Sequence, residues 1–172
     1  MTIAYLHVKE SNRIFIGGIM VTDEFGIPKE FKYSEPVKPT KLQVILYGKV
    51  LSKYIKIEVL TKNLLTKLDN NPEILFTHDM EIATSEEIEN EVLYISTISA
   101  ENMKKDIERI DESEISIKTS SFKGYRIVSK KDPLNYVEKI KELSKTMDLD
   151  EPFNRMEEAL NYVINENSEK GK

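Results

Sequence analysis

The chain of 172 residues contains no cysteine and no tryptophan, and it has only two histidines. Without cysteine it can form no disulfide, thiolate nucleophile, iron–sulfur cluster or cysteine-ligated zinc site. Its apolar runs fall short of the roughly 20 residues that span a bilayer, and its first residues lack the apolar core of a signal peptide. Six glycines and six prolines are too few for a low-complexity chain. We therefore expect a soluble, cytoplasmic globular protein with no disulfides.

The first third of the chain is typical of β-structure. Runs rich in β-branched and aromatic residues cover 3–8, 13–22 and 30–34. Between the second and third runs, Asp23-Glu24-Phe25-Gly26 places a glycine where a hairpin turn with a bulge requires positive φ. This pattern predicts a three-stranded antiparallel meander.

A long helix is predicted over residues 40–68. Thr40 and Gln43 have the spacing of a capping box, in which each side chain satisfies a free backbone N–H of the other residue. Apolar residues then recur at helical spacing for about 29 residues, or roughly 43 Å at 1.5 Å per residue. Because Gly48 costs about 1 kcal/mol inside a helix, we expect a kink or break within 48–56.

The rest of the chain alternates between short strands and helices. Strands are predicted at 73–77, 91–99, 114–119 and 125–129, and helices at 100–111, 133–147 and after Pro152. An acidic loop with at most one helical turn is expected at 79–90. Strands and helices grouped in sets and joined by local hairpins favour an α+β fold.

We therefore predict an antiparallel-dominated sheet of about six to seven strands, a long kinked central helix and two C-terminal helices. Residues 1–165 are expected to form a single domain, and the polar residues 166–172 a flexible tail.

Motifs for catalysis are absent from the sequence. It has no phosphate-binding loop, no glycine-rich dinucleotide turn, no nucleophile elbow and no zinc-protease helix. The tandem glycines Gly17 and Gly18 lie inside a predicted strand, where glycine usually marks a bulge or the close crossing of another element. Close approach of a ligand or partner is the alternative at these two positions.

His7 and His78 are the only residues with an ordinary pKa near neutrality. His78 and Asp79 follow a predicted strand directly, a position from which a general base could act. No spacing selects a third group to complete a catalytic or metal site among the 30 carboxylates. A turn-capping or exposed histidine is the simpler interpretation, and no metal or cofactor is expected.

Charge is distributed unevenly along the chain. Residues 39–68 carry a net charge of +5, residues 69–115 carry −11, and residues 116–131 carry +5. If the basic segments 39–68 and 116–131 shared a face, they would create a positive potential suited to nucleic acid or another polyanion. The candidate contacts in the second segment are Lys118, Lys123, Tyr125, Arg126, Lys130 and Lys131, with Tyr125 stacking on a base. The net charge of −5 and the scarcity of arginine count against this alternative.

Two resemblances follow from the segment Arg13–Gly48, which contains GGIMVTD, EFKY and PTKLQVILYG. This segment resembles a pattern in uncharacterised prokaryotic proteins, which implies no particular activity. The stretch from Gly18 to Asp23 with Gly26-Ile27-Pro28 is similar to the first hairpin of Roadblock/longin-type domains. That resemblance implies a scaffold or dimerisation platform without catalytic residues.

Taken together, these features predict a non-enzymatic protein–protein interaction or scaffold domain, with a homodimer as one form of association. Binding of nucleic acid through the two basic segments is the first alternative. An enzyme that uses His78 and Asp79 is the second.

Overall fold

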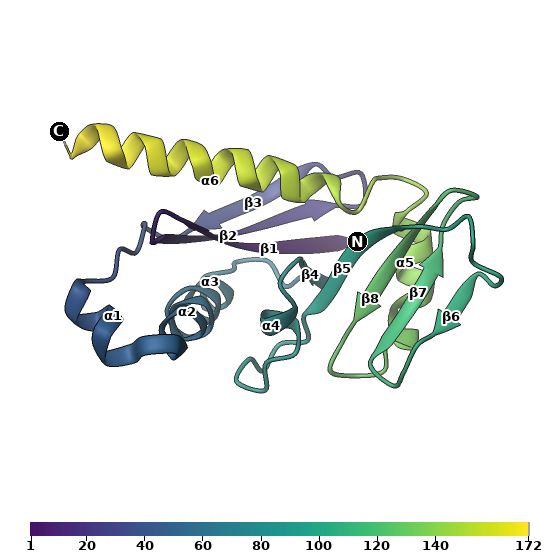
Figure 1. The fold of residues 1–172 in the computed structure, drawn as a ribbon. Helices are drawn as coiled ribbons and strands as arrows, with labels where there is room; N and C mark the ends of the chain where they lie inside the picture. Colours follow the sequence, from purple (N-terminus) through teal and green to yellow (C-terminus); the bar gives the residue numbers. More distant parts are fainter. Residues whose placement is uncertain (172) are drawn as a thin grey trace.

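A computed structural model describes residues 1–171 and shows an α+β fold built on one mixed eight-stranded sheet (Figure 1). The strand order is β3-β2-β1-β4-β5-β8-β7-β6. The strands are β1 Thr2–Ser11, β2 Ile14–Asp23, β3 Pro28–Tyr33, β4 Ile74–Thr77, β5 Leu93–Ser99, β6 Ile107–Arg109, β7 Glu114–Lys118 and β8 Lys123–Val128. The helical elements are α1 Lys41–Tyr47, η1 Gly48–Val50, α2 Leu51–Tyr54, η2 Ile55–Thr61, α3 Lys62–Thr66, α4 Met80–Ala83, η3 Pro133–Tyr136, α5 Val137–Leu143 and α6 Glu151–Lys170.

The α+β class and the first meander are confirmed, but the middle of the sheet differs from the prediction. Strand β4 pairs in parallel with both β1 and β5, whereas the other neighbouring strands are antiparallel. All four residues of β4 are buried, as is typical of a parallel strand covered on both faces. The sheet is therefore mixed, because helical segments connect β3 to β4 and β4 to β5.

The predicted helix at 100–111 is wrong. Residues 107–109 form the edge strand β6, and Ile107 pairs with Ile117 of β7. The side chain of Glu108 accepts hydrogen bonds from the amides of Lys104 and Lys105, which closes the preceding turn. Pairing with a formed hairpin outweighs a weak helical spacing, and the sheet gains an eighth strand.

Helices cover both faces of the sheet, and the side chains of β1, which alternate between the two faces, contact both layers. Ile3 and Tyr5 belong to a core cluster with residues of α5 and α6. Ala4 and Leu6 point to the opposite face and pack with residues of η2, α3 and α4. The sheet therefore lies between two helical layers.

The tandem glycines allow both layers to approach β2 closely. A Cβ atom on Gly17 would lie 2.9 Å from Cδ1 of Leu64 in α3, and one on Gly18 would lie 3.1 Å from Cδ2 of Leu160 in α6. The two glycines thus sit under helices on opposite faces. The close-crossing interpretation fits both positions, and the neighbours are elements of the same chain.

The central helix is interrupted where its glycine falls. The capping box of Thr40 and Gln43 is present, and α1 ends at Gly48 with φ +54°. A short 3-10 turn follows, and a π-helical segment interrupts the run again at Ile55–Thr61. The break expected within 48–56 is confirmed at its first residues.

The C-terminal helices fit the prediction in part. Helix α5 is short and preceded by a 3-10 turn, whereas α6 continues to Lys170. Residues 166–170 of the predicted tail are therefore helical, and Lys172 lies outside the described residues. Among residues 1–171, no helix is both long and apolar enough to cross a membrane.

Candidate functional site

His78 lies at the end of β4 and contacts α6 rather than Asp79. Its ring stacks on Phe153 with the ring centroids 3.7 Å apart, and its Nε2 lies 2.9 Å from Oδ1 of Asp150. Asp79 caps α4 by accepting the amides of Glu81 and Ile82. The side chains of His78 and Asp79 therefore have different partners, and no hydrogen bond joins them within residues 1–171.

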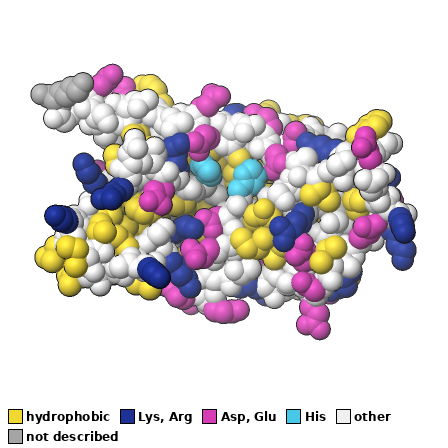
Figure 2. All heavy atoms as spheres, viewed as in Figure 1, with side chains coloured by type: hydrophobic (Ala, Val, Ile, Leu, Met, Phe, Trp, Pro, Cys, Tyr) yellow, Lys and Arg dark blue, Asp and Glu magenta, His cyan; other side chains and the backbone are white. Residues whose placement is uncertain are grey.

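His7 has a similar position on β1. Its Nε2 lies 2.6 Å from Oε2 of Glu157, and Lys9 donates to the other oxygen of the same carboxylate. Burial raises the pKa of Glu157, but the hydrogen bonds from Lys9 and His7 outweigh it and lower that pKa below its ordinary value. Figure 2 shows both imidazoles at the surface of one face. Each imidazole joins the sheet to α6 through a carboxylate.

The candidate nucleic-acid contacts have partners inside the protein. Lys123 pairs with Asp148, and Arg126 forms a bidentate pair with Glu114. The ammonium group of Lys130 donates to the carbonyls of Ser85 and Ile88. Lys118 at the end of β7 is half-buried, and Lys131 is exposed.

Tyr125, which the sequence suggested could stack on a base, lies inside the protein. Its side chain is 1% exposed, and its hydroxyl donates to Asp148 and accepts the amide hydrogen of Leu149. The ring therefore cannot stack on a base, and burial raises the pKa of this phenol. The alternating apolar pattern of the hairpin, not nucleic-acid binding, accounts for an aromatic residue here.

The acidic middle segment contacts both basic segments. Lys56 pairs with Asp79 at 2.8 Å and with Glu81 at 3.1 Å, while Glu114 pairs with Arg126. Burial lowers the pKa of Lys56, but these two carboxylates outweigh it and raise the pKa above its ordinary value. The segments η2 and α3 pack on β1 and β2, and β4 and β5 lie between β1 and β8 in the sheet. The basic segments therefore do not form one continuous positive surface.

The most unusual surface is the helical segment Lys41–Tyr54, formed by α1, η1 and α2, which we call the apolar arm. None of its residues is buried. Its exposed large apolar side chains are Leu42, Val44, Ile45, Leu46, Tyr47, Val50 and Tyr54. Apolar side chains gather at the left end of Figure 2, where Figure 1 places α1. Contiguous exposed apolar surface of this kind marks an interaction site.

The apolar arm also stands away from the body of the protein. A hollow of about 280 Å³ lies beneath it, lined by residues of the arm, of η2 and of the linker that includes Val37 and Pro39. Three lysines of the arm, Lys41, Lys49 and Lys53, form no ion pair with any residue in the range 1–171. The arm is thus both apolar and basic.

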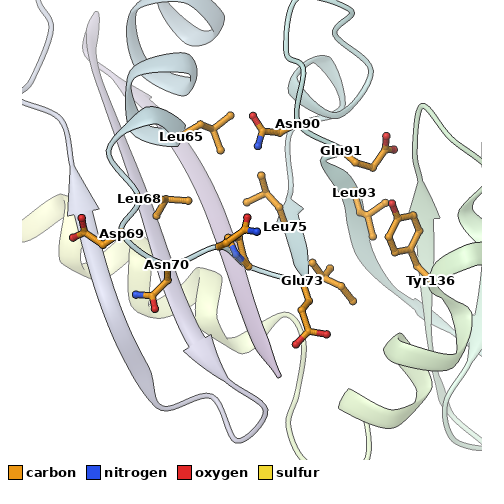
Figure 3. Close-up of a pocket in the computed structure, with 13 residues that line it drawn as sticks. Leu65, Leu68, Asp69, Asn70, Glu73, Leu75, Asn90, Glu91, Leu93 and Tyr136 are labelled. Atoms are coloured by element: carbon orange, nitrogen blue, oxygen red, sulfur yellow. The ribbon is translucent and has the colours of Figure 1, made fainter.

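A second surface of opposite charge lies at the other end of the helical run. Two adjoining hollows of about 320 and 300 Å³ share Leu65 and Asn90, and together they form what we call the acidic groove. In Figure 3, Leu65, Leu68 and Leu75 project into the larger hollow, and Asn90 and Glu91 border it. The groove therefore has an apolar floor.

The rim of the acidic groove carries carboxylates from the acidic segment. Glu87 and Glu89 line the smaller hollow, and Asp69, Glu73 and Glu91 line the larger. Within residues 1–171, Glu87, Glu89 and Glu91 form no ion pair, whereas Asp69 and Glu73 pair with lysines. Burial, aided by the charge of Glu91, raises the pKa of Tyr136, so its phenol stays protonated.

The sequence predicts that the apolar residues of 42–54 form one helical stripe available for packing, but it does not predict that this stripe is exposed. The sequence feature that indicates exposure is the width of that stripe around the helix. Residues 44–47 are apolar without interruption, so apolar side chains extend around α1, in which only Lys41 and Gln43 are polar. A helix that is apolar on all sides requires cover on all sides.

Among the described residues 1–171, no group of three or more histidine, aspartate or glutamate side chains could hold a metal ion.

Comparisons with known proteins give limited information. No protein-family model and no curated protein matches the chain, so the two resemblances stated above remain predictions. Argonaute of Marinitoga piezophila in complex with 5′ OH guide RNA is 17% identical with a TM-score of 0.37, over 83% of this chain and 24% of the Argonaute chain. Endonuclease V of Bacillus subtilis is 11% identical with a TM-score of 0.45, over 83% of this chain and 68% of that chain. The chain spans about a quarter of the Argonaute length. Scores this low show no common fold and carry no information about what the chain binds.

Proposed function

We propose that this protein is a non-enzymatic association domain that binds another protein surface through the apolar arm. The observation that carries the proposal is a helix, α1, that has no buried residue and is apolar except for Lys41 and Gln43. Such a helix is stable and soluble only when a second surface covers it.

The exposed area is large enough for specific association. The exposed fractions of the seven apolar side chains of the arm add up to about four fully exposed residues. At about 150 Å² or more for a large side chain, this is roughly 600 Å², near the upper limit for a monomer and close to one partner's share of a standard interface. Leu42, Ile45 and Leu46 have the spacing of anchors for a helix in a groove.

The histidines favour a structural role over an enzymatic one. His7 and His78 direct Nε2 to carboxylates of α6 and its preceding turn, and both rings contact Phe153. These contacts connect α6 to the ends of β1 and β4. They are the interactions expected of groups that stabilise packing.

Site-specific cross-linking in living cells tests the proposal. A photoreactive phenylalanine analogue at position 46 should form an adduct with one defined protein, because Leu46 is 72% exposed within the apolar arm. The matched control is position 122, since Phe122 is 73% exposed in the distant turn between β7 and β8. Equal labelling from both positions, or none from position 46, would contradict the proposal.

A further inference from the structure

We infer that the apolar arm of one copy docks in the acidic groove of a second copy of this chain. The inference rests on the proposed function and names its partner. The groove has the volume and the charge to receive the arm, and the two surfaces lie at opposite ends of one helical run, so the arm cannot reach the groove within one chain.

The hollows of the acidic groove are large enough to hold side chains of the apolar arm. A cavity of about 150 Å³ holds a benzene ring, so hollows of about 300 and 320 Å³ have room for two large side chains each. Leu42, Ile45 and Leu46 project from neighbouring positions on one side of α1. The groove would receive them on Leu65 and Leu68, which are half-buried.

The charges of the two surfaces are complementary. Residues 36–57 contain five lysines and no acidic residue. The rim of the acidic groove offers Glu87 and Glu89, which form no ion pair within residues 1–171, and one cation, Lys62, which pairs with Glu58. Docking would bring unpaired lysines to unpaired carboxylates, which favours both the rate and the register of association.

The same comparison disfavours other arrangements of two copies. Contact between two apolar arms would bring like charges together, because Lys41, Lys49 and Lys53 flank the apolar residues of both. The exchange of arms places opposite charges at both contacts, and a twofold axis allows each copy to give and receive one arm.

An arm cannot fill the groove of its own chain. The helical segment 55–64 separates the arm from Leu65 in the groove wall. At about 1.5 Å per residue this segment is roughly 15 Å long, and its buried residues Ile57, Leu60 and Leu64 hold it against the sheet. Exchange between copies is therefore the arrangement that this chain allows.

A charge-swap experiment tests the inference. One variant carries Lys41→Glu, Lys49→Glu and Lys53→Glu, and the other carries Glu87→Lys and Glu89→Lys. All five side chains are exposed, so both variants should fold like the wild type, which circular dichroism would verify. Sedimentation velocity would measure the self-association of the wild type, of each variant and of their equimolar mixture.

The inference predicts that the wild type associates and that salt weakens its association. Each variant alone should associate at least about tenfold more weakly, because each brings like charges together. The mixture should recover wild-type association, since both of its contacts again join opposite charges.

Three results would overturn the inference. They are a wild type that is monomeric at every concentration, a mixture that remains as weak as the separate variants, and a monomer that instead binds vesicles containing anionic lipid. An adduct from position 46 with a different protein, together with a monomeric wild type, would overturn this inference and leave the proposed function standing. Absence of any adduct would contradict the proposed function as well.

Discussion

Replacing Gly17 by valine tests the close crossing of α3 over β2. A Cβ atom at this position would lie 2.9 Å from Cδ1 of Leu64 and 3.4 Å from Cβ of Leu60. Both leucines are buried, with 2% and 1% exposed, so neither can move aside freely. Valine suits a strand, but overpacking of a filled core costs about 1–3 kcal/mol. We expect Gly17→Val to lower the free energy of unfolding by about 2 kcal/mol, or to lower Tm by roughly 4–8 °C.

A double-mutant cycle with Leu64→Ala makes this test specific. Leu64→Ala alone should cost about 2–5 kcal/mol because it leaves a cavity under Gly17. In the double variant, the valine methyl groups would occupy part of that cavity, so the combined loss should be at least about 1 kcal/mol smaller than the sum. Urea unfolding followed by circular dichroism measures all four proteins. If the two losses add within about 0.5 kcal/mol, Gly17 does not lie under Leu64 as described.

Three further outcomes follow from the contacts of single side chains. Tyr125→Phe should lose about 1–2 kcal/mol in urea unfolding, because two buried hydrogen bonds disappear; an unchanged midpoint would contradict the buried position of its hydroxyl. The folded-state pKa of Glu157 lies below its ordinary value of 4.5, so this carboxylate stabilises the fold above that pH and the contribution is lost as the pH falls through the lower, folded value. Glu157→Gln should therefore lessen the dependence of Tm on pH in this acid range, and a pH profile identical to the wild type would refute the role of the ion pairs. His78→Ala should lower Tm by a few degrees, because the stacking on Phe153 is lost; a Tm equal to that of the wild type would leave the stacking without a role.

Much of the local structure follows from short-range signals in the sequence. The capping box at Thr40 and Gln43 and the break at Gly48 were predicted because each depends on residues within one helical turn. The parallel pairing of β4 was not predicted, since four buried residues are compatible with either direction of the strand. Strand β6 was also missed, because its pairing with Ile117 depends on a hairpin formed elsewhere in the chain.

The site was predictable only in part, for a related reason. His78 was correctly singled out as following a strand, but its partner Asp150 lies 72 residues away in sequence, and no spacing identifies it. The apolar stripe that includes Leu42 and Leu46 was recognised as a surface available for packing, but its exposure was not predicted. Whether a helix is covered depends on where the chain places the rest of the molecule, and local periodicity contains no such information.

A single introduced tryptophan tests the central claim most directly, because the chain contains none of its own. Leu46→Trp reports on the apolar arm, and Phe122→Trp, at an equally exposed position, serves as the control. As protein concentration rises from nanomolar to high micromolar, the emission of Leu46→Trp should shift to shorter wavelength and become shielded from acrylamide, while that of Phe122→Trp stays constant. Emission from position 46 that remains fully accessible to acrylamide at every concentration would contradict the account.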